Sequence, residues 1–410
     1  MRRKTFYLLF FTMYAASCAK IEHKVIHEPA YLRVFNNLNF RVTIDNQHQT
    51  LSTLTMLINP EYGADGLPIS AETVGDFLVT REPYAPPYPS HIGNALDVYN
   101  PEYPGKERVI AGPILNGFDL SSWAQIPSGQ MRIAFYARPR SEVPFFELEA
   151  RYRAALLIDT VLNLQAKEVY TMHVLQKDFN TKENGILLRQ ENFHKLALAD
   201  SLLYINFYNM SAKGFWEASD GLKPANRNHF LGISGSANFF GIRDEMNVYY
   251  SLYDHRTTRP DPIAAHTNVF LTHLMRDTES PAVARYHPLP LFAGSHADAI
   301  QSFLLQSISL LAPQYDGTDI PNQSAQLYFT PYSYAHIVFS RHTGASNRDI
   351  PWNGWGSSLI NNGIALPNLI VQTHSGVNNP RSFSTVNSLE VVNETVYLTT
   401  VQRVYDPPIY

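Results

Sequence analysis

A single cysteine, Cys18, stands in a chain of 410 residues. It follows a segment laid out like a secretory signal, with a basic start from Arg2 to Lys4, an apolar run from Thr5 to Tyr14 and a small-residue ending from Ala15 to Ser17. An exported chain with one cysteine cannot form an intramolecular disulfide, so its fold has to be stabilised by burial of side chains. The sequence therefore predicts a large hydrophobic core.

The N-terminal segment also predicts a location. An apolar run of roughly ten residues is shorter than the about 20 that a transmembrane helix needs. A cysteine directly after small residues is similar to the bacterial lipobox, in which the thiol is diacylated and becomes the new N-terminus. We interpret residues 1–17 as the signal peptide of a lipoprotein, Cys18 as the residue that carries lipid, with acyl chains such as palmitate, and residues 18–29 as a polar tether. An ordinary secretory signal cut after Ala19 is the alternative.

The composition of the remaining chain limits its partners and its fold class. Removal of the signal lowers the number of Lys and Arg from 32 to 29 against 36 Asp and Glu, and the formal net charge from -4 to -7. Nucleic acid is not expected to be a partner at that charge. The chain holds 24 Tyr, 23 Phe and 27 Pro, a balance that favours strands and rigid turns over long helices. We therefore expect a mainly β protein.

Strand patterns recur along the chain, for example over residues 31–36 and 169–175, and residues 40–45 show period-two alternation. The first can be laid on residues 204–209, and Val169-Tyr170-Thr171 on Val396-Tyr397-Leu398, so the two halves open and close alike. We predict two tandem antiparallel β-sandwich (Ig-like) domains, over residues 30–200 and 201–410.

The second domain is expected to contain a helical insertion at about residues 260–315. Ser295 can cap a helix that ends at Ala312, because Pro313 stops it and the apolar residues recur at spacings of three and four. These apolar residues are Ile300, Phe303, Leu304, Ile308 and Leu311. A second helix is predicted over Ala264 to Leu274.

Four short segments carry a resemblance to a known family. They are the opening Leu32-Arg33-Val34-Phe35-Asn36, the Asp-bearing Val42-Thr43-Ile44-Asp45, the turn at Ser128-Gly129 and the closing strand from Val169 to Leu175. Together they resemble the DUF4397 family of Bacteroidota lipoproteins, over parts of residues 31–179 and more weakly 202–405. The resemblance implies an exported β-sandwich protein without an assigned reaction, placed at the outer membrane, and it lends no catalytic residues. A second likeness is to the fimbrillin-type pilins of the same bacteria.

Candidate chemistry is sparse. Fifteen histidines are present, but no His-Glu-x-x-His motif occurs and no metal site is predicted. Asp254-His255 with Ser234 is a weak match to a Ser-His-Asp hydrolase, since the glycine pattern of a nucleophile elbow is incomplete. Trp352 and Trp355 lie three residues apart among turn formers, so they are the candidate ligand-binding residues for a glycan or a protein; the alternative is that both rings fill the end of the sandwich.

These features predict a lipid-anchored cell-envelope protein with a binding or structural role. Its expected partners are the membrane, through the N-terminal lipid, and a glycan or protein ligand; no catalysis and no cofactor are expected. A pilus subunit and an unrecognised hydrolase are the alternatives. A pilin needs a strand that can be donated between subunits, so a closing strand over Thr395 to Val404 in the centre of a sheet would count against it.

Overall fold

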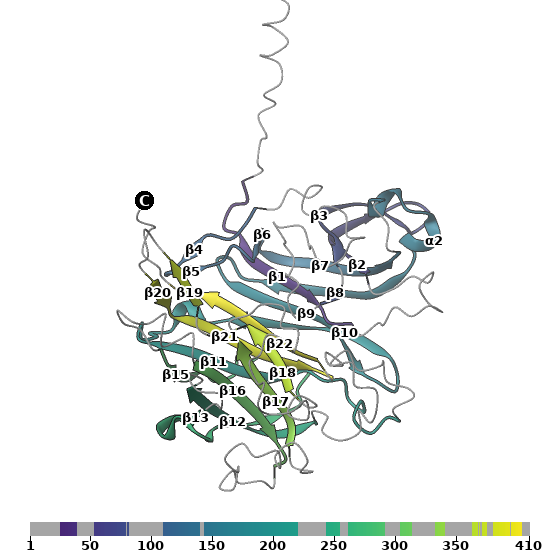
Figure 1. The fold of residues 1–410 in the computed structure, drawn as a ribbon. Helices are drawn as coiled ribbons and strands as arrows, with labels where there is room; N and C mark the ends of the chain where they lie inside the picture. The colour runs from purple at the N-terminus through teal and green to yellow at the C-terminus, as the bar shows by residue number, and fades with distance from the viewer. Residues whose placement is uncertain are drawn as a thin grey trace, which may run out of the picture.

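The computed structural model describes residues 25–38, 53–78, 80–81, 110–139, 143–219, 243–254, 261–291, 304–313, 333–340, 363–367, 369, 371–374, 380–393 and 395–403. Within these residues the fold is mainly β, with one short α-helix, α2 (Ala150–Arg153). No helix in this part of the chain is long and apolar enough to cross a membrane. The prediction of a mainly β protein is confirmed (Figure 1).

The first half of the chain builds two sheets. The first inner sheet has the order β10-β9-β1-β6, and β1 runs parallel to β9. The first outer sheet has the order β3-β2-β7-β8. The strands of the inner sheet are β1 (Ala30–Asn36), β6 (Ala124–Ile126), β9 (Val169–Asp178) and β10 (Glu183–Glu191), and those of the outer sheet are β2 (Thr53–Tyr62), β3 (Pro68–Leu78), β7 (Gly129–Arg138) and β8 (Leu156–Leu164).

The second half also builds an inner and an outer sheet. The second inner sheet has the order β15-β11-β21-β22, with β11 parallel to β21; the second outer sheet has the order β13-β12-β16-β17-β18, with β14 paired to β12. The inner strands are β11 (Leu202–Asn209), β15 (His287–Pro290), β21 (Thr385–Val392) and β22 (Thr395–Gln402), and the outer strands are β12 (Glu245–Asp254), β13 (Asp261–Pro262), β14 (Val269–Met275), β16 (Leu304–Leu311), β17 (Ser333–Ser340) and β18 (Gly363–Pro367).

Short elements complete the described fold. Two small hairpins pair β4 with β5 and β19 with β20, and three 3-10 turns lie in the connections. Their bounds are β4 (Ile114–Leu115), β5 (Phe118–Asp119), β19 (Val371–His374), β20 (Pro380–Phe383), η1 (Phe145–Glu147), η2 (Phe193–Lys195) and η4 (Ala264–His266).

Each half packs its inner sheet on its outer sheet around a separate core. In the first half the core contains Leu32 and Val34 from β1 against Met56 and Phe135 from the outer strands. In the second half the core residues include Ile205 and Phe207 from β11, Leu389 from β21 and Val248, Ile308 and Phe339 from the outer strands. Alternate residues of each inner strand supply these contacts, as expected when side chains point to opposite faces of a sheet.

The strand pairing of the first half recurs in the second. Tyr31 pairs with Val169 between β1 and β9, and Tyr204 pairs with Val386 between β11 and β21. The sequence match of residues 31–36 with 204–209 therefore joins equivalent positions. The match of Val169 with Val396 is wrong, because the equivalent of β9 is β21, whereas β22 occupies the place of β10. The mismatch arose because Val-Tyr occurs near the start of both β9 and β22, whereas β21 has Val386-Asn387 at the corresponding position.

The predicted helices are also wrong where the structure describes them. Val269–Met275 is strand β14, and Leu304–Leu311 is strand β16, which lies between β12 and β17. Ile308 and Leu310 of β16 face the core, and Ser307 and Ser309, which alternate with them, lie on the opposite face, so the segment has the period of a strand. Pairing with two neighbouring strands overrides the spacing of three and four that suggested a helix. Residues 295–303, the first part of the predicted helix, lie outside the described residues.

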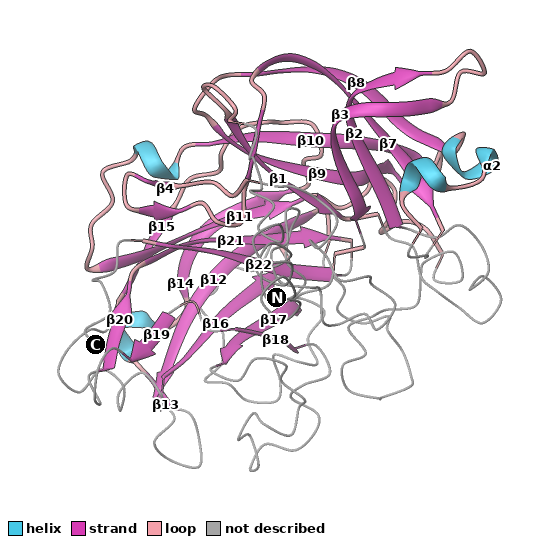
Figure 2. Ribbon diagram, turned by 90° about the horizontal axis from the view of Figure 1, so that it is seen from above, coloured by secondary structure: helices cyan, strands magenta, loops and turns pink. Residues whose placement is uncertain are grey.

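The two inner sheets face each other, so the molecule has four layers in the order outer, inner, inner, outer (Figures 1 and 2). Tyr31, Phe118 and Val169 from the first half share one apolar cluster with Val386 and Val401 from the second. A second shared cluster includes Leu175, Leu187, Val392 and Tyr397. Every residue of β1 and of β21 is buried, since both faces of each inner sheet are covered.

Candidate functional site

The sequence-predicted site residues are not placed by the structure. Cys18, Trp352 and Trp355 lie outside the described residues, as do Ser234 and His255 of the hydrolase hypothesis. Among the residues that are described, no group of three or more His, Cys, Asp or Glu is arranged to hold a metal ion.

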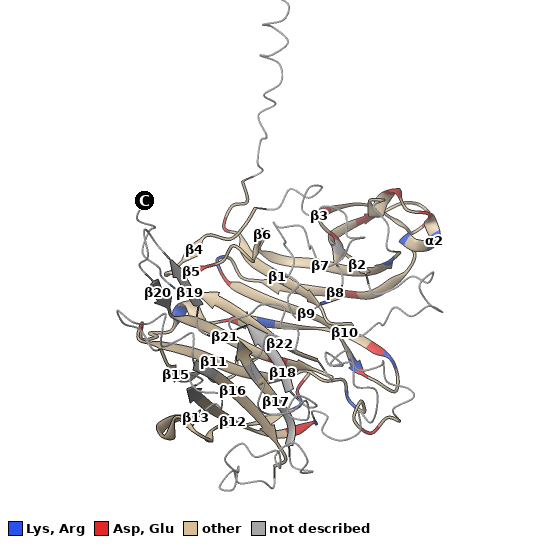
Figure 3. Cartoon of the chain, viewed as in Figure 1, with Lys and Arg blue, Asp and Glu red and all other residues tan. Residues whose placement is uncertain are grey.

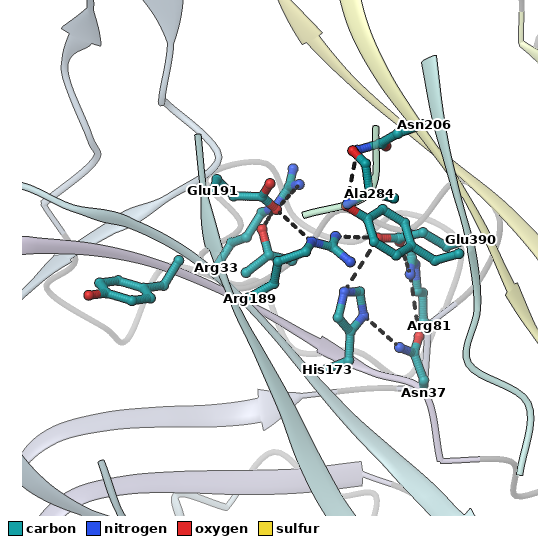
Figure 4. A network of polar contacts seen from close by, with 12 residues as sticks. Arg33, Asn37, Arg81, His173, Arg189, Glu191, Asn206, Ala284 and Glu390 are labelled. Carbon is teal, nitrogen blue, oxygen red and sulfur yellow. Dashed lines mark hydrogen bonds and ion pairs between the residues drawn. The ribbon is translucent and has the colours of Figure 1, made fainter. Parts of the chain in front are cut away.

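The densest polar group in the described fold lies between the two inner sheets, and we call it the interface cluster (Figure 4). Acidic and basic positions are otherwise interspersed along the described ribbon (Figure 3). Every ion-paired side chain of the interface cluster is at most 5% exposed. Five of its residues come from the first half and one from the second; they are Arg33, Arg81, His173, Arg189, Glu191 and Glu390.

Glu390, on β21, is the centre of the cluster. One carboxylate oxygen accepts a hydrogen bond from Arg189 Nη2 at 2.7 Å and lies 3.4 Å from His173 Nε2. The other oxygen lies 2.8 Å from Arg81 Nη1. Burial disfavours the charged carboxylate, but His173 and the two guanidinium groups outweigh this effect and hold the pKa of Glu390 well below its usual range. Glu390 is therefore an anion that joins the two halves.

His173, on β9, is held in one tautomer. Asn37 Oδ1 faces Arg81 Nη1 at 3.5 Å, which turns the Asn37 amide so that its Nδ2 donates to His173 Nδ1 at 2.9 Å. The proton of the neutral imidazole then sits on Nε2, toward Glu390. Burial lowers the pKa of His173 to about 4, with Glu390 opposing the shift. At neutral pH the ring is therefore uncharged, and its Nε2 lies 3.4 Å from the Glu390 carboxylate.

The arginines of the cluster also stack on aromatic rings. Arg81 lies between Phe35 and Tyr397, with its guanidinium carbon 3.8 Å and 4.2 Å from the two ring centroids. The guanidinium of Arg189 lies 3.9 Å from the ring centroid of Tyr208. Such contacts strengthen in a desolvated site. Two of the three rings come from the second half, so these contacts also hold the halves together.

Arg33 is bound on the first-half side of the interface. Its Nε donates to Thr171 Oγ1 at 2.9 Å, its Nη2 lies 3.8 Å from Glu191, and it stacks 4.1 Å from the ring of Trp123. Burial lowers the pKa of Arg33 to about 10, and the charges of Glu191 and Glu390 oppose the shift. The group remains cationic at neutral pH.

The cluster carries more positive than negative charge. Its members in the described residues are three arginines, two glutamates and a neutral histidine, and Arg189 Nη1 has no hydrogen-bond partner among the described residues. Because each ion-paired side chain is buried, a substrate has no access to it for acid or base catalysis. The arrangement instead binds one half of the chain to the other.

A second buried polar group holds the connection between β7 and β8 against the first outer sheet. Asp76 accepts hydrogen bonds from Thr55 Oγ1 at 2.6 Å and from the backbone of Phe145 at 2.9 Å, and it pairs with Arg138. Arg138 also donates to the carbonyl of Val143 at 2.5 Å. These bonds fix η1 on the outer face of the sheet, where Phe145 is buried.

Sequence reasoning missed the interface cluster. Arg33 and His173 alternate with apolar residues along their strands, and that pattern normally indicates a face exposed to water. Their burial follows only from the packing of one inner sheet on the other. The signal in the sequence was the aromatic residues at the same alternate positions, Tyr31 and Phe35 on β1, which are large for an exposed sheet face.

A scan against protein-family models and a search of curated proteins each found no match to this sequence. The resemblance to the DUF4397 family is therefore carried by the short motifs alone and stays a prediction.

Proposed function

We propose that this protein is a lipid-anchored component of a bacterial cell envelope, attached at the outer membrane through Cys18, with a binding or structural role. A non-catalytic role is supported by the position of the densest group of ionisable side chains in the described fold. They are buried between the inner sheets and join the two halves, as Glu390 does through Arg81 and Arg189.

The architecture we propose is a pair of tandem β-sandwiches, one from each half. The repeated pairing of β1 with β9 and of β11 with β21 supports it, as do the two separate cores. In such a molecule the outer sheets of the described fold are available to a ligand, whereas the facing sides of the inner sheets are covered. Trp352 and Trp355 belong to the connection between β17 and β18, two strands of the second outer sheet.

The anchor is tested by intact-mass spectrometry of the protein extracted from membranes, with Cys18→Ala as the comparison. We expect a chain that starts at Cys18 and carries two or three acyl chains, and a variant that is not lipidated. An unmodified chain that starts after Ala19 would refute the lipoprotein proposal.

The binding role is tested with Trp352→Ala and Trp355→Ala in a glycan array on the mature protein. Loss of binding in both variants would support a glycan-stacking surface. The matched control is Phe270→Ala on β14, because that ring is 53% exposed and lies on the same outer sheet. Equal binding by all three variants and wild type would remove the tryptophans from the proposal and leave the structural role.

One observation keeps the pilus subunit as a second candidate. β22 (Thr395–Gln402) pairs only with β21 among the described strands and so lies at the edge of the second inner sheet, not at its centre. Its Tyr397 and Val401 are buried between the halves, so withdrawal of the strand would open that interface. Unheated SDS gels of cell envelopes test this candidate: a ladder of multimers supports a pilin, and a single monomer band contradicts it.

A further inference from the structure

We infer that the interface between the inner sheets is a two-fold dimer interface contained within one chain, and that its charges have become selective for pairing the first half with the second. This inference goes beyond the proposed function, because it concerns what each inner face recognises. It rests on which residues meet across the interface.

Equivalent residues meet along the two central strands. Val169 on β9 and Val386 on β21 occupy the same place in their sheets and share one apolar cluster. Leu175 and Val392, at the other end of the same strands, share another cluster. Between them His173 and Glu390, which pair with Phe35 and Tyr208, lie 3.4 Å apart. Two facing strands whose equivalent residues meet from end to end run in the same direction and are related by a two-fold axis along them.

The flanking strands obey the same symmetry. A two-fold axis along β9 and β21 places β10 over β11 and, equivalently, β22 over β1. The first contact is observed in Arg189 of β10, which stacks on Tyr208 of β11. The second is observed in Tyr397 of β22 and Phe35 of β1, which enclose Arg81 from its two sides. The interface is therefore isologous in form, as in a C2 homodimer, where the same surface is used twice.

The charges break this symmetry. In the first half the positions that face the partner hold Arg33, His173, Arg189 and Glu191. From the register of the strand pairs, the equivalent positions in the second half hold Asn206, Glu390, Thr399 and Val401. At these four positions the first face carries two arginines and one glutamate, and the second carries a single carboxylate.

This distribution makes only one pairing favourable. Two copies of the first face would bury Arg189 and Arg33 against the arginines of the other copy. Two copies of the second face would bring two Glu390 side chains together at the axis. Like charges that meet in a desolvated interface disfavour the wrong partner. The first face therefore selects the second face, within the same chain, over another copy of itself.

The test uses the full mature chain with a specific protease site inserted between Leu196 and Ala197, both of which are exposed. After cleavage, sizing chromatography with light scattering reports whether the halves stay together. We expect one particle of the uncleaved mass. Cleaved wild-type halves that separate at micromolar concentration would overturn the inference.

Selectivity is tested by exchange of the two residues at the axis. Glu390→His alone should weaken association of the cleaved halves by at least about a hundredfold, because it removes the anion that pairs with Arg81 and Arg189. The double variant His173→Glu with Glu390→His returns a carboxylate to the axis, now on β9 of the first half. Its cleaved halves should associate at least about tenfold more tightly than those of Glu390→His alone. No recovery would refute the two-fold relation.

Two controls separate this result from loss of folding. Circular dichroism is recorded on each uncleaved variant, so that association is compared only between folded chains. Asp159→Asn removes a comparable arginine pair from the first outer sheet, where Arg132 and Asp159 are 46% and 31% exposed. It should leave association of the cleaved halves unchanged; a loss equal to that of Glu390→His would show that the effect is not specific to the interface.

Discussion

Replacement of Glu390 by Gln is the sharpest single test of the interface cluster. The substitution keeps the size of the side chain and removes its charge. Arg81 and Arg189 then lose the carboxylate that lies 2.8 Å and 2.7 Å from them, and both guanidinium groups stay buried. Glu191 becomes the only anion of the cluster among the described residues, and it serves Arg33 as well as Arg189.

The expected cost follows from breaking a buried ion pair. Removal of one partner leaves an uncompensated buried charge and typically costs about 3–5 kcal/mol of unfolding free energy. Glu390 serves two arginines, so the upper part of this range applies. This cost in unfolding free energy is lowered only if water enters the interface and solvates the arginines. The aromatic stacking of Arg81 between Phe35 and Tyr397 limits such entry.

The assay is guanidinium or urea unfolding of the mature domain pair with Cys18→Ala, followed by tryptophan fluorescence at pH 7. The control is Glu168→Gln, which removes a carboxylate from a partly exposed pair with Lys195 and should cost at most about 1 kcal/mol. A Glu390→Gln variant that unfolds within about 1 kcal/mol of wild type would show that the cluster does not hold the halves, and the reasoning from burial and pairing would fail.

Three further results are expected. The free energy of unfolding should fall as the pH is lowered from 6.5 toward 4, because His173 is protonated near pH 6.5 in the unfolded chain whereas its pKa in the folded chain is about 4. The loss from this residue is roughly 3 kcal/mol. His173→Gln should reduce the pH dependence, measured by unfolding curves at pH 5 and 7. Asn36→Ala and Asn209→Ala should each cost about 1–3 kcal/mol by chemical unfolding, since each side chain accepts from the backbone amide two residues on and donates to a backbone carbonyl of a distant segment, that of Leu78 or of Arg243. Lys167→Ala should change stability by less than about 1 kcal/mol in the same assay, because its pair with Glu28 is exposed.

The sequence could predict the local structure of the first half better than that of the second. The pattern of apolar residues placed strands correctly over residues 31–36 and 169–175, which lie within β1 and β9. The same principle was misapplied at Leu304–Leu311, where Ile308 and Leu311 also fit a helical spacing. A short apolar segment cannot be assigned by periodicity alone, because the neighbours that decide its state come from elsewhere in the chain.

The candidate site could not be predicted, for a related reason. A polar residue at alternate positions of a strand is compatible with water or with a second sheet, and local sequence does not distinguish them. His173 was visible only as part of a strand motif, and Glu390 had no feature that marked it. Their pairing joins residues 217 positions apart, so it depends on how the two halves pack and not on either segment.

The location of the charges has a consequence for where a ligand can bind. Joining the inner faces removes both of them from solvent, and the cluster that joins them requires a fixed register between the halves, since Glu390 must reach Arg81 and Arg189 together. The two outer sheets are then held at a constant separation, each on the far side of an inner sheet. This arrangement presents two related outer sheets in one fixed geometry, which is compatible with the binding or structural role that we propose. We infer that the asymmetric charges keep the chain from closing on a second copy through its inner faces, and we therefore expect a ligand to bind on the outer-sheet side of the described fold.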